Sequence, residues 1–324
     1  MILVTGATGL VGNNVVRLLV ERGQRVRALV RPGCDPRPLA GLPIETAPGD
    51  VCQAGSLQAA CRGVRGVIHA AGHVHIGHRG LERHRQINVV GTCNVARAAR
   101  EAGAAMVYVS SVNALGIGSL RQPATEETPP GGYAPIPYVA TKREADRAIL
   151  DEVERGLRAM IVHPGFMLGP WDWKPSSGQL LLAVGKRKAL VAPPGWFDVC
   201  DVRDVAAAIL TALEEGTPGR RYITAGPATR YGDAMRLFAQ VTGARAPWTP
   251  RGPIVMAVAG RAGDLWAAIS GREPAVNSAA LAMARLEKSY SSDRAAAELG
   301  YRTRPMEETV RDAWNWFREH GYAR

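Results

Sequence analysis

Three glycines spaced three residues apart near the N-terminus constrain the fold of this 324-residue chain more than any other feature. The short apolar run before them, Ile2 to Val4, predicts a buried strand, and the apolar residues after them recur at helical spacing. Strand, glycine turn and helix in this order predict the opening of a dinucleotide-binding fold. Gly6 would permit the tight turn, Gly9 the close approach of a pyrophosphate, and Gly12 the packing of helix on strand.

A pyrophosphate in this loop would accept hydrogen bonds from the free backbone N–H groups at the helix N-terminus. We therefore expect the cofactor to contact the whole loop, namely Gly6, Thr8, Gly9, Leu10, Val11 and Gly12.

The rest of the N-terminal half alternates between predicted strands and helices, which is typical of an α/β doubly wound parallel sheet. We expect a Rossmann domain built from residues 1–164 plus 198–224. A smaller, mostly helical substrate domain would comprise residues 165–197 plus 225–324. The segment from Trp196 to Val205 is expected to supply a strand that returns to the main sheet, followed by the start of a helix.

The residues that follow the next predicted strands suit the remainder of a dinucleotide. The second strand ends at Arg31 with no acid immediately before it, which favours the 2′-phosphate of NADP and leaves NAD possible. Asp50 and Val51 would flank the adenine. The small residues at the end of the fourth strand, Ala70, Ala71 and Gly72, would let the cofactor lie against backbone.

Ser111, Tyr138 and Lys142 are the residues that can perform chemistry beside a nicotinamide. Tyr138 and Lys142 are four residues apart on a predicted helix and therefore share one face. A neighbouring ammonium stabilises phenolate, so Tyr138 can exchange a proton with a carbonyl oxygen while hydride moves at the carbon. Ser111, at the end of the fifth strand, would hold that oxygen. Tyr138 has a lysine four residues later, whereas Tyr108, Tyr133 and Tyr290 do not.

Charge, cysteine content and apolar segments limit the classes of binding partner that we expect for this chain. The net charge of +11 is spread along the chain without a basic stripe and aromatic partners, so we expect no nucleic acid. Five scattered cysteines without metal-ligand spacing indicate the cytoplasm. His73, His75 and His78 form a loop that we expect at the rim of the substrate cleft, and we expect no metal site. The apolar segment from Pro253 to Ser270 is interrupted by charges, which predicts a buried or interfacial helix and no membrane span.

The sequence resembles the extended short-chain dehydrogenases/reductases of the epimerase/dehydratase group. The motifs that carry the resemblance are the glycine loop, Asn88-Val-Val-Gly-Thr92, Ser110-Ser111, Tyr138-Val-Ala-Thr-Lys142 and His163-Pro-Gly-Phe-Met-Leu-Gly-Pro170. Val30-Arg-Pro-Gly33 and Gly271-Arg-Glu-Pro274 look closest to bacterial dihydroflavonol-reductase-like proteins, some of which are labelled hopanoid-associated sugar epimerases.

The resemblance implies a seven-stranded parallel sheet and a homodimer formed through the helices of residues 81–102 and 138–155. It also implies further cofactor contacts from Asn88, Ser110, Pro164, Gly165, Phe166 and Met167, with Tyr138 and Lys142 touching the cofactor as well as the substrate. Asn113 departs from the family pattern, and Ser110-Ser111-Val112 lacks the two acids that 4,6-dehydration requires.

Our leading hypothesis is an NADP-dependent reductase or dehydrogenase for a ketone, aldehyde or secondary alcohol. Five aromatic or apolar side chains suggest an apolar, ring-containing small molecule as its substrate: Phe166, Met167, Trp171, Trp173 and Trp196. The alternatives are a nucleotide-sugar epimerase with tightly bound NAD and a non-enzymatic NADP sensor.

Overall fold

The largest element of the chain, in a computed structural model that describes residues 1–250 and 254–323, is a seven-stranded sheet. Its strand order is β3-β2-β1-β4-β5-β6-β9, and each neighbouring pair is parallel. The strands are β1 (Ile2–Thr5), β2 (Val26–Val30), β3 (Glu45–Pro48), β4 (Gly66–His69), β5 (Ala105–Val109), β6 (Ala159–Pro164) and β9 (Arg221–Thr224). The predicted fold class is therefore confirmed, and the order of the strands reverses between β1 and β4.

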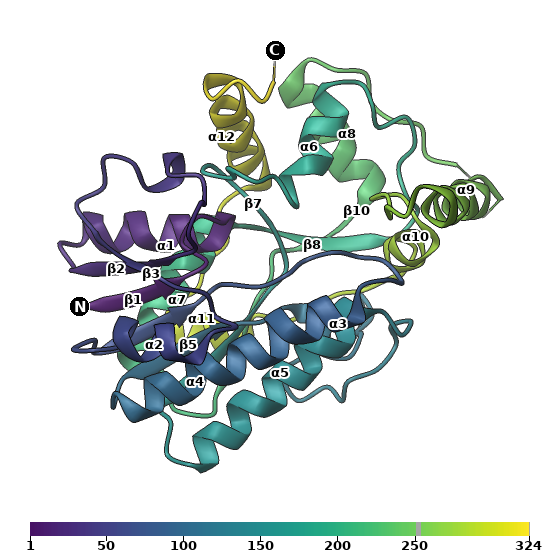
Figure 1. Cartoon of the computed structure of the whole chain (residues 1–324). Helices are drawn as coiled ribbons and strands as arrows, with labels where there is room; N and C mark the ends of the chain where they lie inside the picture. The colour runs from purple at the N-terminus through teal and green to yellow at the C-terminus, as the bar shows by residue number, and fades with distance from the viewer. Residues whose placement is uncertain (251–253, 324) are drawn as a thin grey trace.

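Helices cover both faces of this sheet because alternate strand residues are apolar on both sides. Ile2 and Val4 pack in one hydrophobic cluster, whereas Leu3 packs in the other. The first cluster includes α1 (Leu10–Glu21), α7 (Val202–Glu215) and α11 (Asp293–Leu299). The second includes α2 (Ala54–Ala60), α4 (Gly91–Glu101) and α5 (Pro137–Glu154). Figure 1 shows α1 and α7 on one side of the sheet and α4 with α5 on the other.

The long helix expected at residues 81–102 is divided into three parts. It begins as α3 (Leu81–His84), continues as a π-helical stretch, η2 (Arg85–Val90), and ends as α4. π-Helical turns are rare and frequently lie at functional sites. This one carries Asn88, whose side chain is used in the site described below.

A second, three-stranded sheet has the order β10-β8-β7. Its strands are β7 (Phe166–Leu168), β8 (Trp196–Asp201) and β10 (Ala228–Arg230). The expectation that the strand at Trp196 returns to the main sheet is therefore wrong. β9 occupies the free edge of β6, and the apolar side chains of β8, Phe197 and Val199, pack into a separate hydrophobic cluster.

That separate cluster forms the core of the C-terminal lobe, which Figure 1 shows above and beside the main sheet. Its helices are α6 (Gly178–Gly185), α8 (Tyr231–Thr242) and α12 (Met306–Glu319), while α9 (Ile254–Ser270) and α10 (Ser278–Ala284) pack together at the outer edge. The described residues also form two short 3-10 helices, η1 (Arg37–Leu39) and η3 (Val112–Ala114). Pro253, where the predicted apolar segment begins, lies outside the described residues. Within those residues, no helix has both the length and the apolar composition needed to cross a bilayer.

Candidate active site

The glycine loop joins β1 to α1 at the carboxyl end of the sheet. Gly6 has a φ of +69°, and a Cβ at this position would lie 2.6 Å from the backbone of Ala70 and Ala71. A Cβ on Gly12 would lie 2.2 Å from the Gly6 carbonyl oxygen, so both glycines are required by the local packing. Gly9 is different, because its nearest neighbour would be 3.4 Å away.

The N-terminus of α1 can hold an anion. Gly9 caps the helix without a side-chain hydrogen bond, and the first turn contains no acidic residue. The first N–H groups of such a helix have no intrahelical partner, and together they form the positive end of the helix dipole. The residues present therefore fit a pyrophosphate. Leu10 and Val11 are buried in the core, so only their backbones can contribute.

The end of β4 faces the same loop. Thr5 Oγ1 lies 2.6 Å from His69 Nδ1, and His69 Nε2 lies 3.0 Å from Thr92 Oγ1. Burial lowers the pKa of His69 to about 3, so the imidazole is neutral and acts as a structural link. These bonds hold Ala70, Ala71 and Gly72 in place beside the glycine loop.

The adenosine end of the predicted site contains Arg31, which is exposed directly after β2. The carboxylate of Asp50 accepts a hydrogen bond from the Cys52 backbone at 2.9 Å, which orders the turn after β3. Val51 is buried under this turn. The expected positions of these residues at neighbouring strand ends are confirmed, and their contacts with a cofactor remain predictions.

Ser111 and Tyr138 come together at the end of β5. Both side chains are buried, Ser111 caps η3, and Tyr138 is in the first turn of α5. Burial raises the pKa of the Tyr138 phenol, while a hydrogen bond with Ser111 acts in the opposite direction. The phenol is therefore protonated at neutral pH in the protein alone.

Lys142 lies one turn further along α5, and its ammonium makes contacts that the sequence did not indicate. Nζ donates to the Tyr108 hydroxyl at 3.1 Å and to the Val109 carbonyl at 2.9 Å. Burial lowers the pKa of Lys142 to about 8, and the charge of Asp146 opposes this shift. A Cβ on Gly72 would lie 3.8 Å from Nζ, so the buried Lys142 ammonium lies next to the small residues that follow β4.

Asp146 extends the Tyr138–Lys142 face of α5 by another turn. Its carboxylate accepts a hydrogen bond from Ser110 Oγ at 2.5 Å and lies 2.8 Å from His163 Nε2. The Ser110 hydroxyl is thus directed to Asp146, which leaves its backbone as the group available for the predicted cofactor contact. The spacing of positions 138, 142 and 146 could have identified this aspartate.

Asn88 connects the loop after β4 to α5. It accepts a hydrogen bond from the His73 backbone N–H at 2.7 Å and donates to the His73 carbonyl at 3.0 Å and to Thr141 Oγ1 at 3.2 Å. His84 lies beside it with its ring centroid 6.3 Å from that of Tyr138. Burial, with a smaller effect of the charge of His73, lowers the pKa of His84 to about 4.

The histidine loop lies against the α9–α10 connection. His75 Nε2 is 3.0 Å from the Glu273 carboxylate, and His78 Nε2 is 2.8 Å from Ser278 Oγ. The side chains of His75 and His78 are therefore held by the C-terminal lobe, and within the described residues no group of three potential metal ligands was found.

A polar cluster that the sequence did not reveal adjoins Tyr138. It consists of Tyr133, Asp198, Lys288 and Tyr290. Tyr133 packs against the hydrophobic cluster that contains Tyr138, and its phenol is hydrogen-bonded to that of Tyr290. Lys288 Nζ lies 6.0 Å from the centroid of the Tyr133 ring. Burial raises the pKa of Asp198 to about 7 and lowers that of Lys288 to about 8, and the opposite charge of each moderates the shift of the other.

The same cluster borders the segment predicted to face the nicotinamide. Pro164 is buried, and Gly165 packs on the Asp198 carbonyl, where a Cβ would approach to 2.5 Å. Phe166 and Met167 are half-buried, with the Phe166 ring 4.9 Å from that of Phe197. Tyr133 and Tyr290 of the polar cluster are 157 residues apart in sequence, so no spacing pattern could have revealed this cluster.

Trp171 and Trp173 do not support the interpretation as substrate-lining residues. Their ring centroids lie 6.0 and 5.2 Å from that of Trp316 on α12, and Arg17 stacks on Trp171. Both side chains therefore belong to the packing of the C-terminal lobe. Trp196 is half-buried, with the Arg230 guanidinium 5.0 Å from its ring.

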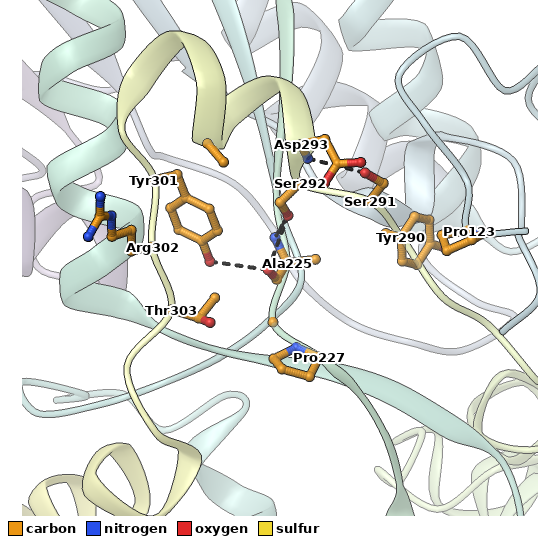
Figure 2. A pocket seen from close by; sticks show the side chains of 12 residues that line it. Pro123, Ala225, Pro227, Tyr290, Ser291, Ser292, Asp293, Tyr301, Arg302 and Thr303 are labelled. Carbon is orange, nitrogen blue, oxygen red and sulfur yellow. Dashed lines mark hydrogen bonds between the residues drawn. The ribbon is translucent and has the colours of Figure 1, made fainter. Parts of the chain in front are cut away.

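Figure 2 shows a depression beyond the end of β9 that contains none of the predicted catalytic residues. The Tyr301 hydroxyl donates to the Ala225 carbonyl at 3.4 Å, and the Ala225 backbone N–H donates to Ser292 Oγ at 3.0 Å. These bonds attach the C-terminal segment to the end of the sheet. We assign this depression a structural role.

Comparison with known proteins agrees with this arrangement. Residues 2–225 match the model of the NAD dependent epimerase/dehydratase family. The chain is 34% identical to sterol demethylase protein B of Methylococcus capsulatus, with 98% of each sequence covered. It is 33% identical to a Synechocystis protein that carries the name dihydroflavonol 4-reductase, covering 99% of this chain and 95% of the relative. The crystal structure of a nucleoside-diphosphate-sugar epimerase from Pseudomonas aeruginosa superimposes with a TM-score of 0.82 at 26% identity, covering 100% of this chain and 99% of that one.

The glycine loop, the protein's parallel sheet and the family match together indicate a nicotinamide dinucleotide as the cofactor. The predicted identity as an enzyme, an NAD(P)-dependent oxidoreductase of the extended short-chain dehydrogenase/reductase type, is confirmed. This protein belongs to the NAD dependent epimerase/dehydratase family.

Proposed function

We propose that this protein is an NADP-dependent reductase of a ketone or aldehyde, acting in reverse as a dehydrogenase of a secondary alcohol. The observation that carries the proposal is the convergence of Ser111, Tyr138 and Lys142 at the end of β5, beside Gly72 and the glycine loop. A bound reduced nicotinamide supplies the hydride that the carbonyl carbon receives.

Tyr138 donates its phenolic proton to the carbonyl oxygen, so a ketone becomes a secondary alcohol. Ser111 orients that oxygen and stabilises the phenolate that remains. The positive charge of the Lys142 ammonium also stabilises the Tyr138 phenolate, which then recovers a proton from solvent. Since burial keeps the phenol protonated at neutral pH, the resting protein is prepared for the reductive direction.

The preference for NADP depends on Arg31. It is an exposed cation at the end of β2, where an acid would bind the 2′-hydroxyl of NAD. An Arg31→Ala variant should lose affinity for NADPH by roughly tenfold, as expected for one charge-assisted phosphate contact, while its affinity for NADH stays constant.

We also propose an apolar, ring-containing substrate. Phe166 and Met167 offer apolar surface near the predicted nicotinamide position, and Lys288 and Asp198 offer polar groups for a substituent. The name of the Methylococcus relative mentions a sterol, and a relative from Stigmatella aurantiaca is named as a ketoreductase of a farnesylated quinoline oxide. Both names describe apolar molecules with fused rings.

For the assembly, we propose the predicted division into a cofactor domain and a substrate domain, a homodimer through α3, η2, α4 and α5, and a cytoplasmic location. α4 and α5 lie side by side on one face of the molecule, which leaves the C-terminal lobe outside the proposed dimer contact (Figure 1).

The decisive experiment compares Tyr138→Phe with Tyr322→Phe, a control whose hydroxyl bonds the Trp173 carbonyl far from the proposed site. With a panel of cyclic ketones and NADPH, Tyr138→Phe should lose activity by at least about 100-fold while binding NADPH normally. The control should retain full activity. Wild-type turnover by Tyr138→Phe would contradict the proposed proton transfer.

A nucleotide-sugar epimerase with tightly bound NAD is the second candidate, favoured by the structural match to the Pseudomonas epimerase. It would retain cofactor through purification and turn over without net oxidation. Nicotinamide absorbance of the purified protein, followed by a test with a nucleotide sugar, distinguishes this candidate from the reductase.

A further inference from the structure

α9 presents large apolar side chains outward. Ile254, Val258, Leu265, Trp266 and Ile269 are 61–76% exposed. These residues recur at helical spacing and form one face, which we call the α9 outer face. Exposed apolar residues are normally scattered singly, so a contiguous face of this kind indicates an interaction site.

The inner face of α9 is built from small residues that hold it firmly on α10. A Cβ on Gly260 would lie 3.0 Å from Ser278 Cα, and one on Gly263 would lie 2.0 Å from the Val276 carbonyl oxygen. Met256 and Ala267 are buried on the same side. The helix is therefore anchored through its less apolar face, which is the reverse of the usual arrangement of a surface helix.

Beside the α9 outer face, the basic residues are more exposed than the acidic ones. Arg261 and Arg272 are exposed. Asp264, the single acid within α9, accepts a hydrogen bond from the Ser278 backbone, and Glu273 is occupied by His75 and by the backbone of the histidine loop. An apolar face with exposed arginines and a tryptophan complements the interface of a bilayer that contains anionic headgroups.

The position of α9 suits such contact. It lies at the outer edge of the molecule, away from α4 and α5, so a dimer through those helices would leave it free (Figure 1). Asn277 Nδ2 donates to the Ile76 carbonyl at 2.8 Å, and His75 and His78 bond the same connection. Hydrogen bonds thus connect the segment that follows α9 to the histidine loop, which begins directly after Gly72.

We propose that α9 lies in the plane of an anionic membrane surface, its outer face inserted among the acyl chains and Arg261 and Arg272 at the headgroups. This attachment is peripheral and does not depend on the chemistry proposed for Tyr138. It would place the histidine loop at the lipid interface, where apolar molecules concentrate.

The test is co-sedimentation of the full-length protein with phosphatidylglycerol–phosphatidylcholine vesicles. Wild-type protein should bind these vesicles and bind pure phosphatidylcholine vesicles more weakly. Leu265→Ser/Trp266→Ser should reduce the partition coefficient roughly 100-fold, since each side chain loses about tenfold of apolar transfer. Both positions are solvent-exposed, so thermal unfolding should be unchanged.

The matched control replaces Leu120, which is 39% exposed and lies outside both the C-terminal lobe and the proposed dimer helices, with serine. This variant should bind vesicles like the wild type. Size-exclusion chromatography of all three proteins tests a second copy as the occupant. Absence of vesicle binding by the wild type, or a dimer that the α9 substitutions dissociate, would overturn the membrane proposal.

Discussion

Gly9→Ala separates the cofactor role of the glycine loop from its structural role. Gly9 has φ −92° and ψ 172°, which alanine adopts without strain, and the new methyl carbon would lie 3.4 Å from its nearest neighbour. Alanine is a poorer N-cap than glycine, but it also restricts the unfolded chain. The two effects oppose each other, so we expect the free energy of unfolding to change by less than about 1 kcal/mol.

Cofactor binding should respond very differently. The methyl group would occupy the space through which a pyrophosphate reaches the free N–H groups of α1. Loss of two charge-assisted hydrogen bonds, at about 1.5 kcal/mol each, lowers the affinity for NADPH by roughly 100-fold. Isothermal titration calorimetry with NADPH measures this change, and thermal unfolding followed by circular dichroism measures the stability.

Gly12→Ala is the matched comparison. Its Cβ would lie 2.2 Å from the Gly6 carbonyl oxygen, and both groups are backbone that cannot rotate away. We expect a loss of about 3 kcal/mol or more, seen as a lower melting temperature. The reasoning fails if Gly9→Ala binds NADPH as tightly as the wild type, or if it is as unstable as Gly12→Ala.

Three further predictions follow from the buried charges. Reduction should decline as pH rises through about 8, because Lys142 then loses the proton that stabilises the phenolate of Tyr138; a rate that is flat from pH 7 to 9.5 would contradict this role. Asp146→Asn should move that decline to lower pH, because the charge of Asp146 raises the pKa of Lys142, and an unmoved pH–rate profile would exclude the coupling. Burial lowers the pKa of Lys288 to about 8 in the folded protein from its ordinary value of 10.5. The unfolded chain therefore binds more protons between these values, and the folded protein gains stability as pH rises. Between pH 7.5 and 10, the free energy of unfolding of the wild type, measured by denaturant titration, should therefore rise by about 2 kcal/mol relative to that of Lys288→Met.

Local patterns in the sequence determined the framework of the fold. The alternation of strand and helix predicted the parallel sheet, and the spacing of Tyr138 and Lys142 predicted their shared helix face. These predictions succeeded because helix and strand periodicities, and the space that a glycine leaves, act between residues close together in the chain.

Tertiary structure alone decided which groups meet across the site and what remains uncovered. Lys142 donates to Tyr108, and Asp198 lies near Lys288, through pairings of distant segments that no spacing encodes. β8 joined a second sheet because β9 already occupied the edge of β6. In α9 the sequence showed an apolar helix, but only the packing of its glycine face on α10 determined that the large side chains point to solvent. Periodicity indicates that a face is apolar, whereas the presence of a partner for that face depends on how the whole chain packs.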